Sequence, residues 1–291
     1  MYPSRFGYEA PKTVEEAIAI LDAHGGEAKI LAGGQSLVPM MKLRFASPEM
    51  LVDLNTIAGL DFHRVDADGS IHIGALCRHE DLEKSEVIKK SQPTIAAAAS
   101  LVADPIVRAR GTFVGSVCHA DPQGDWAAAL TALGGHIVAQ GPKGTRDIAM
   151  KDFVIGPFQN TLAFNEIAIE AVIPAPKGIA RGGYLKLERR VGDFATASVA
   201  VSLDMVGDTV ARAGIALAGV GGRTIDATAA ASVLNGKKLT AENISLAAAA
   251  VAAAAEPRTD HRGSADYKRQ IVKTFVERIL TGLATPSQKA A

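Results

Sequence analysis

The sequence has little cysteine and no net charge, and each shortage excludes a class of function. Its 291 residues include only two cysteines, Cys77 and Cys118, which are too few to build an iron–sulfur or zinc site within this chain. Basic and acidic residues number 31 each, so the formal net charge is +0. No global field therefore favours nucleic acid or an anionic membrane, and we expect a small-molecule ligand or protein partners.

The sequence also lacks a signal-peptide pattern at its start, a long apolar run and the common nucleotide motifs. Residues 1–11 do not show the basic-then-apolar pattern of a signal peptide. The most apolar later run, residues 246–255, is about half of the ~20 residues that a membrane span needs. Two isolated thiols suit a reducing compartment, so we expect a cytoplasmic protein without a membrane span. The absence of GxGxxG, Walker A and GxSxG patterns argues against Rossmann-type dinucleotide binding, nucleotide hydrolysis and elbow serine hydrolases.

The order of predicted elements indicates an α+β protein rather than a strict βαβ alternation. A helix over residues 13–26 has both ends marked, by Thr13 and Glu16 at capping-box spacing and by Gly25 as a left-handed stop. Apolar periodicity predicts the other elements of the first part. These are helices over 79–90, 93–105 and 125–135, strands over 28–33, 50–55, 70–76, 111–117 and 166–174, and a hairpin over 136–150 turning at 142–144.

A second part follows the proline- and glycine-rich cluster at residues 170–178. Its pattern predicts an antiparallel meander over 184–190, 195–205 and 209–222, with the last two strands joined at Gly207 and Asp208. Three helices are predicted after the meander, over 224–234, 241–255 and 264–280. In the last of them Ile271, Phe275, Ile279 and Leu283 form one apolar stripe.

Two adjacent glycines, Gly33 and Gly34, follow the predicted strand at 28–33 and precede a segment with helical character. Glycines let a backbone pass close to a bulky group or adopt positive φ. If Gln35 to Leu37 open a helix, their free amides favour an anion, and the segment forms a diphosphate cradle. A tight strand-to-helix turn without a ligand explains the same pattern equally well.

A second stretch, residues 108–130, again joins an extended run with glycine and serine. It then places His119, Asp121 and Asp125 before a helix. A carboxylate beside a diphosphate cradle can accept hydrogen bonds from ribose or ribityl hydroxyls. The alternative is that Asp121 and Asp125 only cap the following helix.

The two stretches together resemble the FAD-binding medium subunit of the molybdenum hydroxylases, the flavoprotein chain of carbon monoxide dehydrogenase and xanthine dehydrogenase-type enzymes. "LAGGQSLVPMMKLR" at 31–44 is similar to the first FAD motif of that family, and "RGTFVGSVCHADPQGD" at 110–125 to the second. The resemblance runs essentially from end to end. Val114 departs from it, since glycine is usual there, and so does Ala109, where asparagine is common.

The resemblance implies a vanillyl-alcohol-oxidase-type fold, with FAD-binding subdomains at 1–56 and 57–176 and a C-terminal α+β domain at 177–291. It implies backbone and hydroxyl donors to the pyrophosphate in both motifs. Asp125 would accept from flavin hydroxyls, Ile167 would make an apolar contact, and Lys186 would lie near the flavin ring or stand as a solvated strand lysine. The implied cofactor-binding residues are Ala32, Gly33, Gly34, Gln35, Ser36, Leu37, Thr112, Val114, Gly115, Ser116, His119, Asp121, Asp125, Ile167 and Lys186.

The same resemblance implies an electron-transfer role without a catalytic residue or a metal ligand in this chain. FAD would receive electrons from two 2Fe–2S clusters of a small subunit and pass them to an external acceptor. A large subunit would carry the molybdopterin cofactor, and the complex would be a dimer of heterotrimers. Two other functions stay open from the sequence: a self-sufficient flavin oxidoreductase of the same fold, and a flavin-free assembly subunit.

Overall fold

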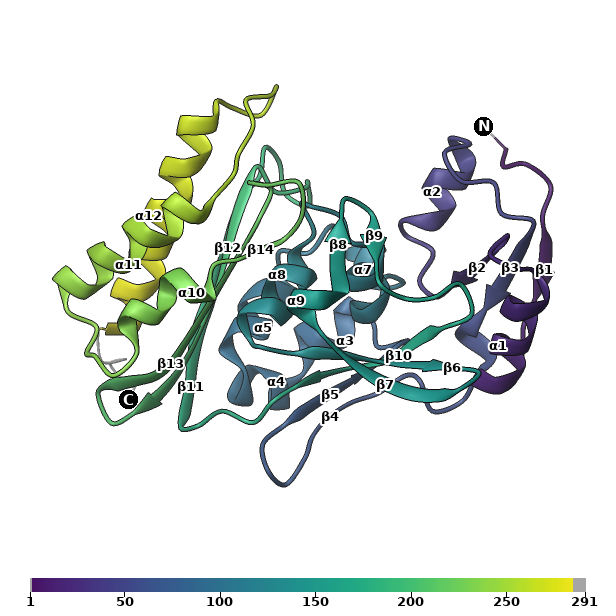
Figure 1. The fold of residues 1–291 in the computed structure, drawn as a ribbon, viewed down its shortest axis with the longest axis horizontal. Coiled ribbons are helices and arrows are strands. Elements are labelled where there is room, and N and C mark those ends of the chain that lie inside the picture. The colour runs from purple at the N-terminus through teal and green to yellow at the C-terminus, as the bar shows by residue number, and fades with distance from the viewer. Residues whose placement is uncertain (1, 285–291) are drawn as a thin grey trace.

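The computed structural model describes residues 2–284, and the chain forms three parts that follow one another across the molecule (Figure 1). The N-terminal part lies at the right of the figure, a larger middle part lies at its centre, and the C-terminal part lies at the left. None of the helices in residues 2–284 combines the length and the apolar composition needed to cross a membrane.

The N-terminal part is a small parallel sheet with strand order β1–β3–β2. Its elements are β1 (Gly7–Glu9), α1 (Val14–Ala23), β2 (Ala28–Leu31), α2 (Leu37–Lys42), β3 (Met50–Asp53) and the 3₁₀ helix η1 (Leu54–Thr56). The predicted ends of the first helix are confirmed. Thr13 accepts a hydrogen bond from the amide of Glu16, and Gly25 adopts a φ of +55°.

The middle part is a five-stranded antiparallel sheet of order β4–β5–β10–β6–β7, with helices packed on one side of it (Figure 1). The strands are β4 (His63–Val65), β5 (Ile71–Gly74), β6 (His136–Gly141), β7 (Gly144–Ala149) and β10 (Ile167–Ile173); the pair β8 (Val154–Gly156) and β9 (Gln159–Asn160) lies apart. The helices are α3 (His79–Lys84), α4 (Glu86–Ser91), α5 (Pro93–Ala99), α6 (Pro105–Arg108), α7 (Phe113–His119), α8 (Asp125–Ala132) and α9 (Met150–Phe153).

The C-terminal part is the predicted antiparallel meander, extended by one short strand to the order β11–β12–β13–β14. Its elements are β11 (Ile179–Leu187), β12 (Ala197–Val206), β13 (Thr209–Ala218), β14 (Ile225–Asp226), α10 (Thr228–Ala231), η2 (Ser232–Leu234), α11 (Ala241–Ala254) and α12 (Ala265–Ala284). The turn after β12 is at Gly207, with a φ of +60°, as predicted.

The C-terminal sheet is covered on both faces. Helices α11 and α12 pack on one face, and α5 and α8 of the middle part contact the other. Nine of the ten residues of β12 are buried for this reason. Tyr184, Ala200 and Ala216 of this sheet belong to the same core cluster as Trp126 of α8, so the middle and C-terminal parts share one hydrophobic core.

Three segment predictions are wrong. Residues 111–117, predicted to be extended, contain the start of helix α7, which Thr112 caps by accepting from the amide of Gly115 at 3.2 Å. Residues 79–90 form two helices rather than one, because Ser85 ends the first and caps the second. Residues 224–234, predicted as a helix, begin with strand β14 and are helical only from Thr228.

The helical conformation of the second glycine stretch determines where the side chain of Val114 lies. Its side chain is only 2% exposed and packs in the core with Phe113 and Val117. Its bulk therefore points into the middle part and does not obstruct the partly exposed side of the helix that carries Gly115 and Ser116. A glycine at this position would leave a cavity in the core.

Val114→Gly should lower the free energy of unfolding by about 2–4 kcal/mol, from the lost buried side chain and from glycine in a helix. The matched control is Val87→Gly, at the equivalent second position of helix α4 but 54% exposed, which should cost only about 1 kcal/mol. Urea unfolding of both variants measures the difference. Equal losses would place Val114 outside the core.

Candidate functional site

The first glycine segment, residues 32–36, is an irregular turn between β2 and α2. Gly34 has a φ of +72°, a conformation that glycine adopts without strain. Helix α2 begins at Leu37, and Ser36 does not cap it with its side chain. Across the described part of the chain, no protein acceptor receives a hydrogen bond from the backbone amides of residues 33–36. These donors are available to a ligand.

The second glycine segment, residues 110–116, runs into helix α7 after Thr112. The hydroxyl of Thr112 accepts from the amide of Gly115, and the amide of Ser116 donates to the carbonyl of Thr112. Phe113 donates its amide to the carbonyl of Cys77, which fixes the start of the segment on the middle part. The segment is thus held by its own helix cap and by the strand-like pairing of Arg78 with Thr112.

The two glycine segments meet backbone to backbone. A Cβ atom on Gly33 would lie 2.4 Å from the carbonyl oxygen of Arg110 and 2.7 Å from the Cα of Gly111. A Cβ atom on Gly115 would lie 3.9 Å from the Cβ of Ala32. Gly33 is therefore bare because the other segment occupies the space of its side chain. The predicted juxtaposition of the two motifs is present.

His119 is the last residue of α7, and Asp121 lies just beyond its end. The imidazole of His119 packs against Phe158, with ring centroids 5.1 Å apart, and burial lowers its pKa. Between them Ala120 adopts a φ of +52°. Asp121 accepts from the amide of Gln123 at 2.8 Å, so its carboxylate stabilises the turn that leads to α8.

Asp125 and Lys186, predicted as separate cofactor contacts, form a buried pair. One carboxylate oxygen of Asp125 accepts from the hydroxyl of Tyr184 at 2.5 Å, and the other lies 3.0 Å from the Lys186 ammonium group. Lys186 also donates to the carbonyl of Leu101 at 2.9 Å. Only 2% of its side chain is exposed, so Lys186 is not a solvated strand lysine. Burial raises the pKa of Asp125, while Lys186 and Tyr184 oppose this effect.

Tyr184 is a member of this cluster that the sequence analysis missed. It stands two residues before Lys186 in β11, and side chains at that spacing share one face of a strand. The alternation in β11 was therefore the available signal. The cluster joins α8 of the middle part to the C-terminal sheet.

Ile167 does not present a surface to a ligand. Its side chain is fully buried at the start of β10 and belongs to the core of the N-terminal part, with Val52 and Leu76. The expected apolar contact with a cofactor has no exposed atoms on which to form, and we assign Ile167 to this core.

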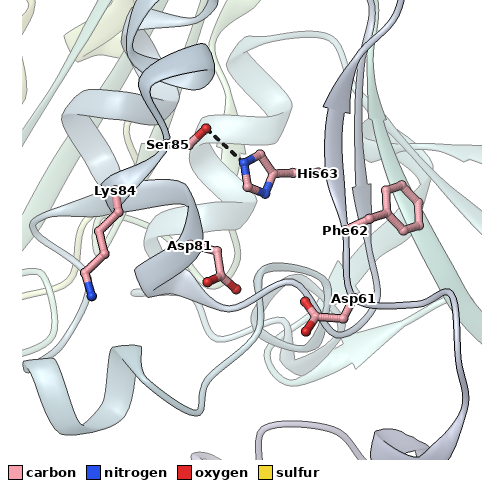
Figure 2. Close-up of a pocket in the computed structure, with 6 residues that line it drawn as sticks. All are labelled: Asp61, Phe62, His63, Asp81, Lys84 and Ser85. Carbon is pink, nitrogen blue, oxygen red and sulfur yellow. Dashed lines mark hydrogen bonds between the residues drawn. The ribbon is translucent and has the colours of Figure 1, made fainter.

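A hollow between residues of β4 and α3 contains none of the predicted cofactor residues (Figure 2). It measures about 480 Å³ and is lined by Asp61, Phe62, His63, Asp81, Lys84 and Ser85. Figure 2 shows the hydrogen bond between the imidazole of His63 and the hydroxyl of Ser85, whose length is 2.9 Å. This polar hollow is separate from the contact between the glycine segments.

His79 supports the second segment from beneath. Its ring is 4% exposed, and its Nδ1 atom accepts from the indole of Trp126 at 2.8 Å. A Cβ atom on Gly111 would lie 2.6 Å from its Nε2 atom, so the segment rests directly on this ring. Burial, together with the positive charges of Arg108 and Arg78, lowers the pKa of His79 to about 4.

This depressed pKa predicts a loss of stability in acid. Between pH 6.5 and about 4 the unfolded chain binds a proton at His79 that the folded chain does not, so stability falls as pH falls, by up to about 3 kcal/mol. His79→Gln, which keeps an acceptor for Trp126, should make the decline less steep in this window. His261→Gln, at an exposed histidine, should leave it unchanged. Unfolding free energies measured across this range test the assignment, and identical slopes for the two variants would contradict it.

Two known protein families match the chain, and their matches together cover most of its length. Residues 4–176 match the family described as FAD binding domain in molybdopterin dehydrogenase. Residues 183–283 match the CO dehydrogenase flavoprotein C-terminal domain. The family matches therefore include both glycine segments and the strand that carries Lys186.

Individual relatives agree over nearly the whole length. The carbon monoxide dehydrogenase medium chain of Hydrogenophaga pseudoflava is 42% identical over 96% of this chain and 97% of its own length. The 6-hydroxypseudooxynicotine dehydrogenase complex subunit alpha of Paenarthrobacter nicotinovorans is 36% identical over 96% and 95%. Among solved structures, carbon monoxide dehydrogenase from H. pseudoflava matches with a TM-score of 0.92 at 43% identity, covering 97% of this chain and 98% of that chain. Quinoline 2-oxidoreductase from Pseudomonas putida 86 matches with a TM-score of 0.89 at 31% identity, covering 98% of each.

Proposed function

Since this chain belongs to the family of FAD-binding flavoprotein chains of molybdopterin dehydrogenases, we propose that it transfers electrons within a molybdenum-containing oxidoreductase complex. FAD is the cofactor of the family domain that spans residues 4–176. When bound, FAD supplies a centre that accepts and releases two electrons. The residues of this chain bind and orient it, and none is needed as a general acid, base or nucleophile.

The observation that carries this proposal is the meeting of the two glycine segments. The unpartnered amides of residues 33–36 are donors suited to the oxygens of a diphosphate, and hydrogen bonds to a charged acceptor are stronger than neutral ones. The hydroxyl of Ser36, which caps nothing, adds a donor in the same segment. On the facing segment Gly115 and Ser116, in the first turn of α7, are partly exposed, while Thr112 and the side chain of Val114 are buried.

The buried cluster of Asp125, Tyr184 and Lys186 would contribute polar contacts to the same cofactor. Each carboxylate oxygen of Asp125 keeps a second lone pair beyond its protein partner, so a flavin hydroxyl can be accepted in addition. Lys186 carries the buried positive charge that would favour negative charge on a reduced flavin. His119 and Asp121, at the end of α7, would line the cavity in which the proposed cofactor lies and would not bind it directly.

We further propose the partners and the domain division implied by the resemblance. A small subunit with two 2Fe–2S clusters and a large subunit with the molybdopterin cofactor would complete a dimer of heterotrimers in the cytoplasm, with an external electron acceptor. Relatives named as medium chains of carbon monoxide dehydrogenase support this arrangement. The separate main sheets, with strands within residues 7–53, 63–173 and 179–226, support a division into FAD-binding subdomains at 1–56 and 57–176 and a C-terminal domain at 177–291.

Gly33→Ala should push the two segments apart and weaken FAD binding. Loss of one charge-assisted hydrogen bond of roughly 1.5–3 kcal/mol raises Kd about ten- to two-hundredfold. The control is Gly222→Ala, where a Cβ atom meets nothing within 4 Å. FAD titration into both apoproteins, with circular dichroism to confirm folding, measures the effect. A folded Gly33→Ala chain with unchanged Kd would show that this contact only shapes a turn.

Affinity capture of the chain from its native host should bring down two further subunits together with iron and molybdenum. Native mass measurement should give a particle with two copies of each chain. An extract of the host without the affinity tag is the control. Recovery of this chain alone, with complete substrate turnover, would contradict the subunit role.

A further inference from the structure

The two glycine segments are joined by a hydrogen-bonded bridge of two side chains, Asn55 and Arg78. The amide nitrogen of Asn55 donates to the carbonyl of Ala32, next to Gly33, at 2.8 Å. One guanidinium nitrogen of Arg78 donates to the amide oxygen of Asn55 at 2.6 Å. Another donates to the carbonyl of Arg110 at 2.6 Å. The bridge therefore spans from one segment to the other.

Both members of the bridge are held by further contacts. The backbone and side-chain nitrogens of Asn55 donate to one oxygen of Asp53, at 2.9 and 2.5 Å, and the hydroxyl of Tyr8 donates to the other at 2.6 Å. The amide of Arg78 donates to Asp81 at 3.0 Å, which anchors it at the start of α3. The bridge thus continues into the N-terminal sheet on one side and into the middle part on the other.

The charges around Arg78 explain why an arginine can occupy this place. Burial and then the nearby charge of Arg110 lower its pKa, while the carboxylates of Asp61 and Asp81 oppose this effect. Those two carboxylates line the hollow of Figure 2. Arginine also offers a fixed fork of donors, and only such a fork can serve two acceptors at set positions.

The bridge fixes the direction of a donor in the first segment. The carbonyl of Ala32 and the amide of Gly33 belong to one planar trans peptide group, so they point to opposite sides. When Asn55 holds this carbonyl, the unpartnered amide of Gly33 is directed away from the bridge. The carbonyl of Arg110, held by Arg78, is the atom on which Gly33 packs.

We propose that Asn55 and Arg78 are positioning residues, which set the separation of the two glycine segments and the orientation of the Gly33 amide for FAD. This inference rests on the proposed FAD-binding function. It assigns neither residue a contact with the cofactor. It predicts that the two side chains act as one unit, because either loss opens the same bridge.

The test is a double-mutant cycle on FAD binding by the purified chain, with Asn55→Leu, Arg78→Met and the double variant. Each single variant should raise Kd about tenfold or more, as expected for one lost charge-assisted hydrogen bond. The double variant should bind no more than a few-fold worse than the weaker single variant, since coupled residues are non-additive. Circular dichroism and thermal unfolding of the apoproteins monitor folding separately from Kd.

Two controls separate geometry from charge. Arg64→Met removes an exposed arginine paired with Asp66 and should leave Kd unchanged. Arg78→Lys keeps the positive charge without the planar fork, and should bind FAD as weakly as Arg78→Met. Normal affinity in Arg78→Lys, additive losses in the double variant, or a lowered melting temperature with unchanged Kd would each overturn the inference. Failure of the unmodified chain to bind FAD would instead reject the proposed function.

Discussion

The close approach of Gly33 to the backbone of Arg110 and Gly111 is the constraint on which the site depends. There is no room for a side chain between these segments, which come from the N-terminal and middle parts of the molecule. That contact places the free amides of residues 33–36 near the start of α7, where Gly115 lies close to Ala32. Neither segment alone would surround an anion, so the proposed cofactor site depends on their assembly.

The rest of the fold holds the two segments in this relation. The second segment rests on the buried ring of His79, which is fixed by Trp126 of α8. Helix α8 in turn packs on the C-terminal sheet and carries Asp125, which is paired with Lys186 of β11. A path of buried contacts therefore leads from the C-terminal part to the cradle. Removing one partner of such a buried pair costs far more than breaking an exposed one.

Local signals in the sequence predicted much of the fold. The caps of α1 and the turn between β12 and β13 depend on residues a few positions apart, and both are present. The prediction for residues 111–117 was wrong because valine, phenylalanine and threonine favour strands, whereas tertiary packing buries Phe113 and Val114 in a helix. The cap at Thr112 and the break at Ser85 were local signals that had been available.

The sequence predicted the glycine segments of the candidate site but not the side-chain pairs around them. The glycine segments were recognisable because their residue types follow from backbone requirements. The pairing of Asp125 with Lys186 and the bridge of Asn55 to Arg78 join residues far apart in the chain, and neither leaves a periodic or local pattern. Val114 was recognised only as a departure from the family motif, because the direction of its side chain could not be known before the segment was seen to be helical.

Hydrogen–deuterium exchange of the backbone amides, with and without FAD, tests the central claim most directly. Because the two segments form one site, FAD should slow exchange in residues 33–36 and in residues 112–116 together, over the same range of FAD concentration. The amides of the C-terminal helices α11 and α12 provide an internal reference. Protection confined to one segment, or absent from both while FAD is bound, would contradict the account.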